Sequence, residues 1–344
     1  MLQCDRTIFT SLPSRTGEGY RLVAWSAGLR PEERQELTRR APSHDSLTAA
    51  PAKARTGTRT LAAAAAASVP PSTPAVATSS PSAAAEDPPH GIIQFHLQIS
   101  GRAGWGFTRV AGAEHTRRGG GRVWTDFLVC DAAEACAHGL HISEIRAALA
   151  AAPELKQPLG GSPLARVAIA RVGSGSPAAR GARAVSAAAA TASLLLADQA
   201  CVIAAGTDAP ELLEDALRMI PASLRSGIDA CAGFRFSPSR GVKVTITDRI
   251  DQDTMRATRG QGVVCVDLEK QMPQASGPMV PWLTLMSRWW SEERGSDAAE
   301  LADRLGAGWT PEEIVRVAAL CEAIDRGDER PERLGELLVR RNAA

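Results

Sequence analysis

The sequence predicts an α+β protein that has a mostly antiparallel sheet with flanking helices, a second and smaller α/β unit, and a helical C-terminal tail. Three observations support this prediction. The chain has 344 residues of which 44% are hydrophobic, enough for a substantial core. Its first half holds several strand-like stretches with partial apolar and polar alternation, whereas helical and strand-like stretches alternate after residue 182. From Pro281 onward the pattern is helical.

The first half begins with two predicted strands, residues 7–10 and 20–25, joined by a turn rich in Gly, Ser and Pro. Pro31 then starts a helix that runs to about Arg40, with proline in the first turn and acidic residues at the positive end of the helix dipole. Residues 48–89 are mainly Ala, Pro, Ser and Thr, so we expect a disordered insert within this unit.

Three further strands are predicted after the insert, and two short helices follow them, the second at about 142–151. A stretch rich in Gly, Pro and Ser, residues 159–181, separates the two halves. We therefore divide the chain into an N-terminal α+β unit (1–158), this break (159–181), an α/β unit (182–275) and a helical tail (276–344). The three strands expected after the insert cover residues 92–100, 105–110 and 122–130.

The second half is expected to contain two helices and four strands before the tail. In the tail, Thr310-Pro311-Glu312-Glu313 has the spacing of a helix start, with Thr310 as N-cap and Glu313 as its capping-box partner. The expected helices are 182–197 and 209–219, and the expected strands are 201–204, 228–236, 242–247 and 262–268.

Charge and cysteine content narrow the class of protein. The formal net charge is +1 and the pI about 7.7, so bulk electrostatics predicts neither a nucleic-acid nor a membrane partner. No apolar run reaches the roughly 18 residues that span a bilayer. The seven cysteines are scattered and odd in number, which is typical of reduced, buried thiols in a cytoplasmic protein.

Known catalytic and cofactor motifs are missing from the sequence. No G-x-x-x-x-G-K-[ST] phosphate loop occurs, and the glycines at 101, 104 and 106 lack the dinucleotide spacing. The adjacent Ser43, His44 and Asp45 point in different directions and cannot relay a proton. We expect no catalytic residue and no cofactor.

A zinc site is conceivable at Cys136, His138 and His141. However, no paired C-x-x-C accompanies these residues, and Gly139 interrupts the helix that would align them. We therefore expect no metal.

Two patterns are candidates for partner binding. The glycine run with Arg117, Arg118 and Arg122 is either an anion-binding nest or a flexible hairpin connection with solvated arginines. Trp282, Leu285, Met286, Trp289 and Trp290 share one helical stripe, which is either core or an exposed hot spot.

Arg225, Arg235 and Arg240 lie near predicted strand ends and form either a basic patch or solvated end residues. The partner-binding hypothesis includes these three arginines together with Trp289 and the arginines of the glycine run.

Several motifs resemble the N-terminal domain, second type, of the bacterial GTPase-associated protein family. They are Thr10-Ser11 followed by Gly19-Tyr20, Ser26-x-Gly28-Leu29 and Ala41-Pro42, then the run 118–125, and finally the arginine-containing run 221–240. The resemblance covers roughly residues 1–270. Where relatives tend to have a histidine after the Thr that ends the run 118–125, this chain has Asp126.

The resemblance implies a non-catalytic adaptor or regulator in a bacterial small-GTPase-linked signalling or conflict system. It would bind a small GTPase or an associated protein, and it establishes no catalytic residue. Two alternatives stay open: a hydrolase or nucleotide-handling enzyme with an unfamiliar site near Arg117 to Asp126, and a purely structural scaffold. A concave pocket that holds Arg122, Asp126 and His138 together would favour the enzyme.

Overall fold

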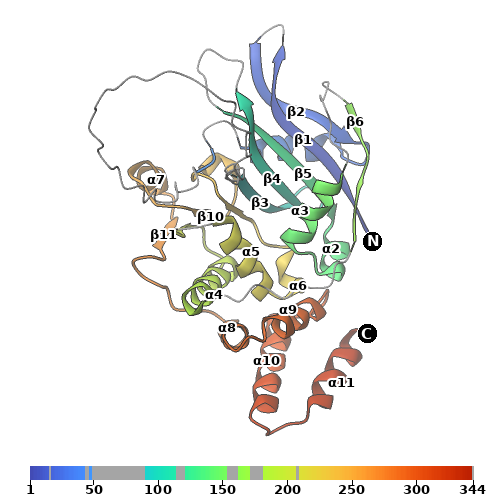
Figure 1. Ribbon diagram of the computed structural model, residues 1–344, viewed down its shortest axis with the longest axis vertical. Coiled ribbons are helices and arrows are strands. Elements are labelled where there is room, and N and C mark those ends of the chain that lie inside the picture. Colours follow the sequence, from blue (N-terminus) through green and yellow to red (C-terminus); the bar gives the residue numbers. More distant parts are fainter. Residues whose placement is uncertain are drawn as a thin grey trace, which may run out of the picture.

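The strands of this protein form one mixed sheet. The computed structural model describes residues 1–14, 17–42, 46–48, 90–113, 121–152, 162–170, 181–206 and 209–342. Within these residues an eleven-stranded sheet has the order β11-β8-β10-β9-β3-β4-β5-β1-β2-β6, and β7 pairs with β1 beside this path (Figure 1). Helices flank the sheet, so the α+β prediction is confirmed. The predicted insert, 48–89, lies outside the described residues except for Thr48.

The antiparallel half consists of long strands that lie in the order β3-β4-β5-β1-β2. Its strands are β1 (Leu2–Ser14), β2 (Gly17–Ser26), β3 (His90–Leu97), β4 (Arg102–Ala113) and β5 (Gly121–Asp131). They confirm the strands predicted in this part and extend most of them, but β3 ends at Leu97, before the predicted end at residue 100. Two three-residue strands, β6 (Ser162–Leu164) and β7 (Val167–Ile169), pair with β2 and β1.

The parallel half contains β8 (Cys201–Ala204), β9 (Ala230–Ala232), β10 (Val244–Thr247) and β11 (Val264–Asp267). Strand β9 also pairs antiparallel with β3, with Ile93 opposite Cys231. The two predicted units therefore share a single sheet across residues 1–158 and 182–275. This continuity depends on a contact between segments far apart in the sequence, which local patterns do not report.

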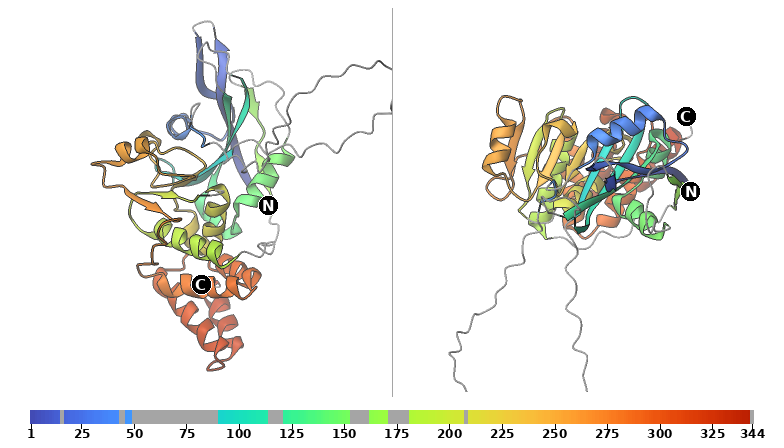
Figure 2. Two further views of the ribbon diagram at one scale, coloured as in Figure 1. Left: turned by 60° about the vertical axis from the view of Figure 1, so that its left-hand side comes forward. Right: turned by 90° about the horizontal axis from the view of Figure 1, so that it is seen from above.

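Helices cover both faces of the antiparallel half, as Figure 2 shows from two directions. Helix α1 (Pro31–Arg40) packs over the face that carries Phe9, Phe95 and Phe127. Helices α2 (Ala132–His138) and α3 (Ile142–Ala151) lie on the opposite face, against Trp105 and Leu128. These helices match the predicted ones because each has its own start signal, such as Asp131, which caps α2.

The remaining helices surround the parallel half and form the tail at the bottom of Figure 1. Thr310 caps α10 through the backbone N–H of Glu313, and the Glu313 carboxylate accepts from the N–H of Thr310, as predicted. These helices are α4 (Ala182–Leu196), α5 (Ala209–Met219), α6 (Ala222–Arg225), α7 (Gln252–Thr258), α8 (Val280–Ser291), α9 (Gly295–Arg304), α10 (Pro311–Asp325) and α11 (Pro331–Asn342), with a 3-10 turn at Pro238–Arg240. None of the helices in the described part of the chain is long and apolar enough to cross a bilayer.

The structure differs from the sequence prediction in short elements. Strands β6 and β7 lie inside the predicted break 159–181, and helices α6 and α7 were not predicted. The two strands exist because β1 and β2 supply their hydrogen-bond partners, and three residues carry too little periodicity to predict a strand. The strand predicted at 228–236 is shorter because Gly233, with a φ of 78°, ends it.

Candidate functional site

The arginines predicted to bind a partner are placed in different environments. Arg117 and Arg118 lie outside the described residues. Arg122 is half-buried at the start of β5, where its Nε donates to the carbonyl of Ala111 at 3.1 Å. Arg235 is exposed just after β9. Arg122 and Arg235 are therefore at or near the surface.

Arg225 is buried, in contrast to the predicted surface patch. Its side chain donates to the carbonyls of Leu217 and Ile220 and to those of the α2–α3 turn, and it forms an ion pair with Asp303 at 3.1 Å. His141 contacts the other oxygen of Asp303 at 2.8 Å. Arg225 therefore holds α3, α6 and α9 together and does not present its charge to a partner.

Arg240 and Trp289 are also buried, at 6% and 5% exposure. Arg240 stacks over Phe234 at 4.9 Å, and the indole N–H of Trp289 donates to Asp325 at 2.9 Å. All five members of the tryptophan stripe are buried, which confirms its interpretation as core. Arg225, Arg240 and Trp289 are thus corrected from surface candidates to interior residues, since the tail and the sheet pack over them.

Of the candidate zinc ligands, His141 has a structural role and Cys136 is buried. His141 caps α3 and contacts Asp303, and no group of three or more metal-binding side chains occurs among the residues that the structure describes. Burial raises the pKa of the Cys136 thiol, and burial also raises that of Cys201 to about 12. These two thiols therefore stay protonated at neutral pH, as buried packing residues do.

Strand register assembles a basic row that the sequence did not suggest. Arg109, Trp124, Thr10 and Arg21 lie directly opposite one another on β4, β5, β1 and β2. Directly paired residues of an antiparallel sheet place their side chains on the same face, and Arg122, two residues before Trp124, shares it. We call Arg21, Arg109, Arg122 and Trp124 the arginine face.

The arginine face is accessible and positively charged. Arg21 and Arg109 are exposed, and Arg122 and Trp124 are half-buried. Neither Arg21 nor Arg109 forms an ion pair with a residue in the described part of the chain. Arginine and tryptophan are enriched where proteins bind one another, because they combine a large contact area with directional hydrogen bonds.

An ion pair lies beside Trp124 on the same face of the sheet. Arg6 donates through Nε and Nη2 to one oxygen of Asp126, at 2.9 and 2.7 Å, and the indole N–H of Trp124 donates to the other oxygen at 2.9 Å. The side chains of Arg6 and Asp126 are 10% and 14% exposed. Both oxygens of Asp126 are thus engaged, which positions the Trp124 ring.

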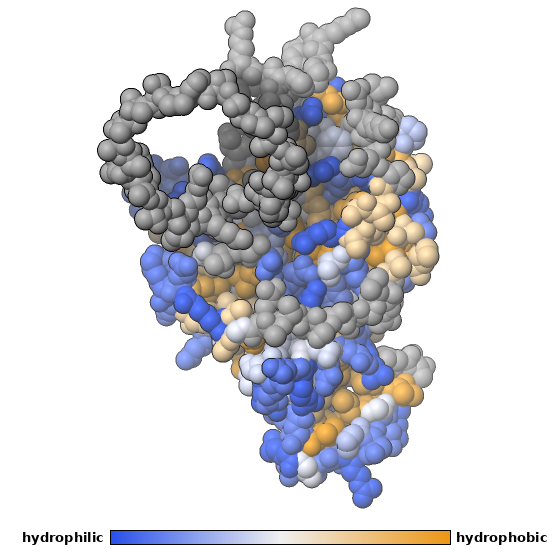
Figure 3. Space-filling model, viewed as in Figure 1, coloured by the Kyte–Doolittle hydropathy of each residue, from blue (hydrophilic) through white to orange (hydrophobic). Residues whose placement is uncertain are grey.

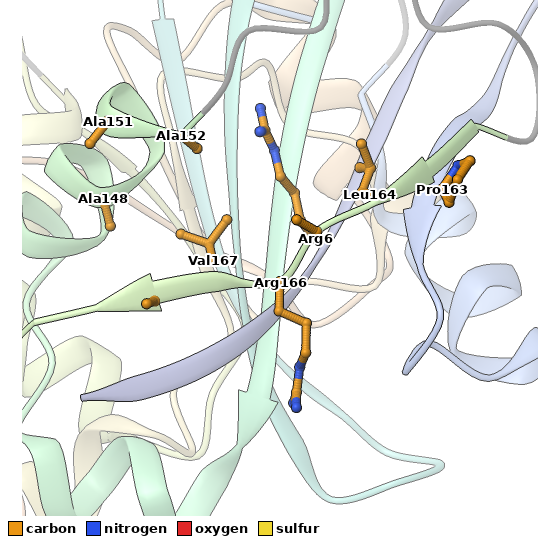
Figure 4. A pocket seen from close by; sticks show the side chains of 10 residues that line it. Arg6, Ala148, Ala151, Ala152, Pro163, Leu164, Arg166 and Val167 are labelled. Atoms are coloured by element: carbon orange, nitrogen blue, oxygen red, sulfur yellow. The ribbon is translucent and has the colours of Figure 1, made fainter.

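A cavity of about 320 Å³ lies beside Arg6 on this face of the sheet (Figure 4). Arg6 points into the space between the end of α3 and the β6–β7 segment, whereas Arg166 points away from it. Figure 3 shows moderately apolar surface over the region of α3. The walls are Ala148, Ala151 and Ala152 of α3 and residues 163–168, and they do not include Arg122, Asp126 or His138.

Sequence reasoning missed Arg6, Arg21, Arg109 and Trp124 as a group. Period-2 alternation places Arg122, Trp124 and Asp126 on one face of a single strand, and this signal was available. The register between β1 and β5 joins residues that are more than 100 positions apart, and no local pattern specifies it.

Comparisons with known proteins identify no relative. No protein-family model, no curated protein and no solved structure matches this chain.

Proposed function

We propose that this protein is a non-catalytic adaptor that binds an acidic protein surface through the arginine face. The observation that carries the proposal is the row of Arg109, Trp124 and Arg21 across four paired strands, with Arg122 beside it. Three guanidiniums around one indole suit a partner that presents carboxylates, because a guanidinium makes two parallel hydrogen bonds to a carboxylate.

The charge balance favours a protein partner over a nucleic acid. Asp126 is neutralised by Arg6, so the three arginines dominate this face, but the whole chain has a net charge of only +1. A polyanion is attracted by many cations over a long surface, whereas a few arginines around an aromatic ring suit a compact interface. The resemblance at residues 118–125 makes a small GTPase or an associated protein the partner we propose.

The enzyme alternative near Arg117 to Asp126 has less support. Asp126 is the carboxylate there that a catalyst would use, and Arg6 and Trp124 engage both of its oxygens. A general base must bring an oxygen within hydrogen-bond distance of the substrate proton. The hydrogen bonds from Arg6 and Trp124 already occupy the two oxygens of Asp126. The cavity on this face is lined by other residues.

A charge-reversal titration tests the adaptor proposal. Arg109→Glu/Arg122→Glu should weaken binding to a small GTPase of the same cell, in one or both nucleotide states, by about 2 kcal/mol or more. The unfolding free energy should change by only about 0.5 kcal/mol, as is usual for surface substitutions. Arg183→Glu/Arg316→Glu is the matched control, since both arginines are exposed on helices far from β4 and β5 in the sequence.

Two outcomes would contradict the proposal. If the arginine-face variant and the wild type bind the GTPase equally well, this face is not the interface. If the wild type alone hydrolyses GTP, the protein is not a non-catalytic adaptor.

A further inference from the structure

We propose that Cys4 and Cys130 form a redox-sensitive pair, which a peroxide closes to a disulfide between β1 and β5. Both cysteines are free thiols in this structure, one near the start of β1 and the other near the end of β5. The inference goes beyond the adaptor proposal, because it concerns an oxidation site and requires no protein partner.

Strand register brings the two cysteines opposite each other. Asp5 pairs with Val129, and Cys4 and Cys130 are the next residues along these two antiparallel strands. Directly opposite residues of an antiparallel pair place their side chains on the same face of the sheet. In agreement with this, both cysteines belong to one buried cluster, to which α2 and α3 also contribute apolar side chains.

The hydrogen-bond pattern places the two backbones close together at this point. The backbone N–H of Arg6 donates to the side chain of Ser26 on β2, which lies on the side of β1 away from β5. Because N–H directions alternate along a strand, the N–H of Cys4 also points away from β5, so Cys4 and Cys130 form a non-hydrogen-bonded pair. The Cα atoms of such pairs are about 4.5 Å apart, and disulfides span about 4.4–6.8 Å.

The two thiols interact and are enclosed. A hydrogen bond with the Cys4 thiol raises the pKa of Cys130, and burial raises it further. Cys4 and Cys130 are 0% and 1% exposed. Since the thiolate is the reactive form of cysteine, the pair stays reduced until local opening of the sheet admits an oxidant. Once one sulfur is oxidised, the other is its nearest partner.

The reaction balances with hydrogen peroxide as the oxidant. One thiol, as its thiolate, attacks a peroxide oxygen and breaks the O–O bond, which gives a sulfenic acid and, with the proton of that thiol, one water. The second thiol then attacks the sulfenic sulfur, forms the S–S bond and releases the hydroxyl group as a second water. The two sulfurs lose two electrons, and the peroxide is reduced to water.

Peptide mapping of the full chain tests the proposal. The reduced protein is treated with hydrogen peroxide under native conditions, its remaining thiols are blocked, and its digest is analysed by mass spectrometry without reduction. We expect the peptide that contains Cys4 to be linked to the peptide that contains Cys130, and dithiothreitol should separate them. The proposal is overturned if both cysteines stay reduced or if either is linked to another cysteine.

Urea unfolding provides a second measurement. The disulfide closes a loop of more than 100 residues, which restricts the unfolded chain. Oxidation should therefore raise the unfolding midpoint of the wild type by about 1 M urea and leave that of Cys130→Ala unchanged. Cys201→Ala is the matched control, since Cys201 is also buried but lies on β8, and it should respond like the wild type.

The reduced variants are unfolded first, which shows whether each is folded, and Cys4→Ala replaces Cys130→Ala if the latter is not. An unchanged midpoint of the wild type after oxidation would overturn the proposal. An equal rise in the variant that lacks one cysteine of the pair would overturn it as well.

Discussion

The antiparallel half and the parallel half with its tail bury their side chains in different ways. In the antiparallel half the apolar residues form separate small clusters, and ion pairs lie between them, such as Arg102 with Asp5 at 2.6 Å and with Glu33 at 3.3 Å. The parallel half and the tail share one large apolar cluster that includes Trp282, Trp290 and Trp309. The first half thus combines small apolar clusters with buried ion pairs, whereas the second is built mainly around one apolar cluster.

Glu33 illustrates the first kind of organisation. Burial opposes its charged form, but the backbone N–H of Arg30 and the charge of Arg102 hold the pKa of this carboxyl below its ordinary value. Buried ion pairs contribute little net stability compared with apolar side chains, but they fix geometry. The half with the arginine face therefore uses charge to fix side-chain positions, and we expect the half with the larger apolar cluster to contribute more of the stability.

The largest expected effect on stability lies in the large apolar cluster of the parallel half and the tail. Trp282 is fully buried and donates to the carbonyl of Met219 at 2.8 Å. Trp282→Ala should lower the unfolding free energy by about 3–5 kcal/mol, because it removes a large side chain and leaves a cavity. Urea unfolding measures this change, and a loss below about 1 kcal/mol would contradict the proposed division between the two halves.

The second largest effect on stability is expected at Asp303, which lies where the two halves meet. Burial raises the pKa of Asp303, but the hydrogen bond from His141 and the charge of Arg225 exceed this effect and lower it overall. A lowered pKa in the folded state stabilises the protein above the unfolded value of about 3.9, and this contribution is lost as the pH falls through the folded value.

Asp303→Asn should therefore cost about 3 kcal/mol or more at pH 7, since Arg225 would be left buried without a counter-charge. The difference in unfolding free energy between this variant and the wild type should narrow as the pH falls below about 4. Urea unfolding between pH 7 and pH 3 tests it. Asp198→Asn is the control, because the Asp198 side chain is 93% exposed and pairs with Lys243 at the surface. A constant gap would contradict the role of Asp303.

A smaller effect is expected at Gly106 in the antiparallel half. A Cβ atom added there would lie 2.5 Å from Ile93 and 2.6 Å from the Phe127 ring, so Gly106→Ala should cost about 1–3 kcal/mol by overpacking. At Gly19, also on a strand, an added Cβ has no neighbour within 4 Å, which makes Gly19→Ala the control. Equal melting curves for the two variants would refute this packing.

The smallest effect on stability is expected on the arginine face. Arg109→Ala should change the unfolding free energy by about 0.5 kcal/mol or less, because the side chain is exposed. Arg102→Ala on the same strand should cost several-fold more, since it removes the buried cation that Asp5 and Glu33 share and leaves these carboxylates with only the half-exposed Arg166 and Arg30, respectively, as described partners. Similar losses of unfolding free energy in both variants would mean that Arg109 also has a structural role.

Patterns within a few residues determined much of the fold. Thr310 and Glu313 specify the start of α10 because a capping box involves only adjacent turns. The helix from Pro31 to Arg40 and the strand around Arg122 to Cys130 were predictable for the same reason: helix-start signals and apolar periodicity act over short distances.

Tertiary structure alone decided the features that matter most for function. Arg225 and Trp289 are interior because α9 and α10 supply Asp303 and Asp325 as their partners, from 78 and 36 positions away. The arginine face exists because β4, β5, β1 and β2 pair in one register, which joins residues more than 100 positions apart. Local sequence sets which side of a strand a residue occupies, but only the pairing of strands decides which residues lie beside it.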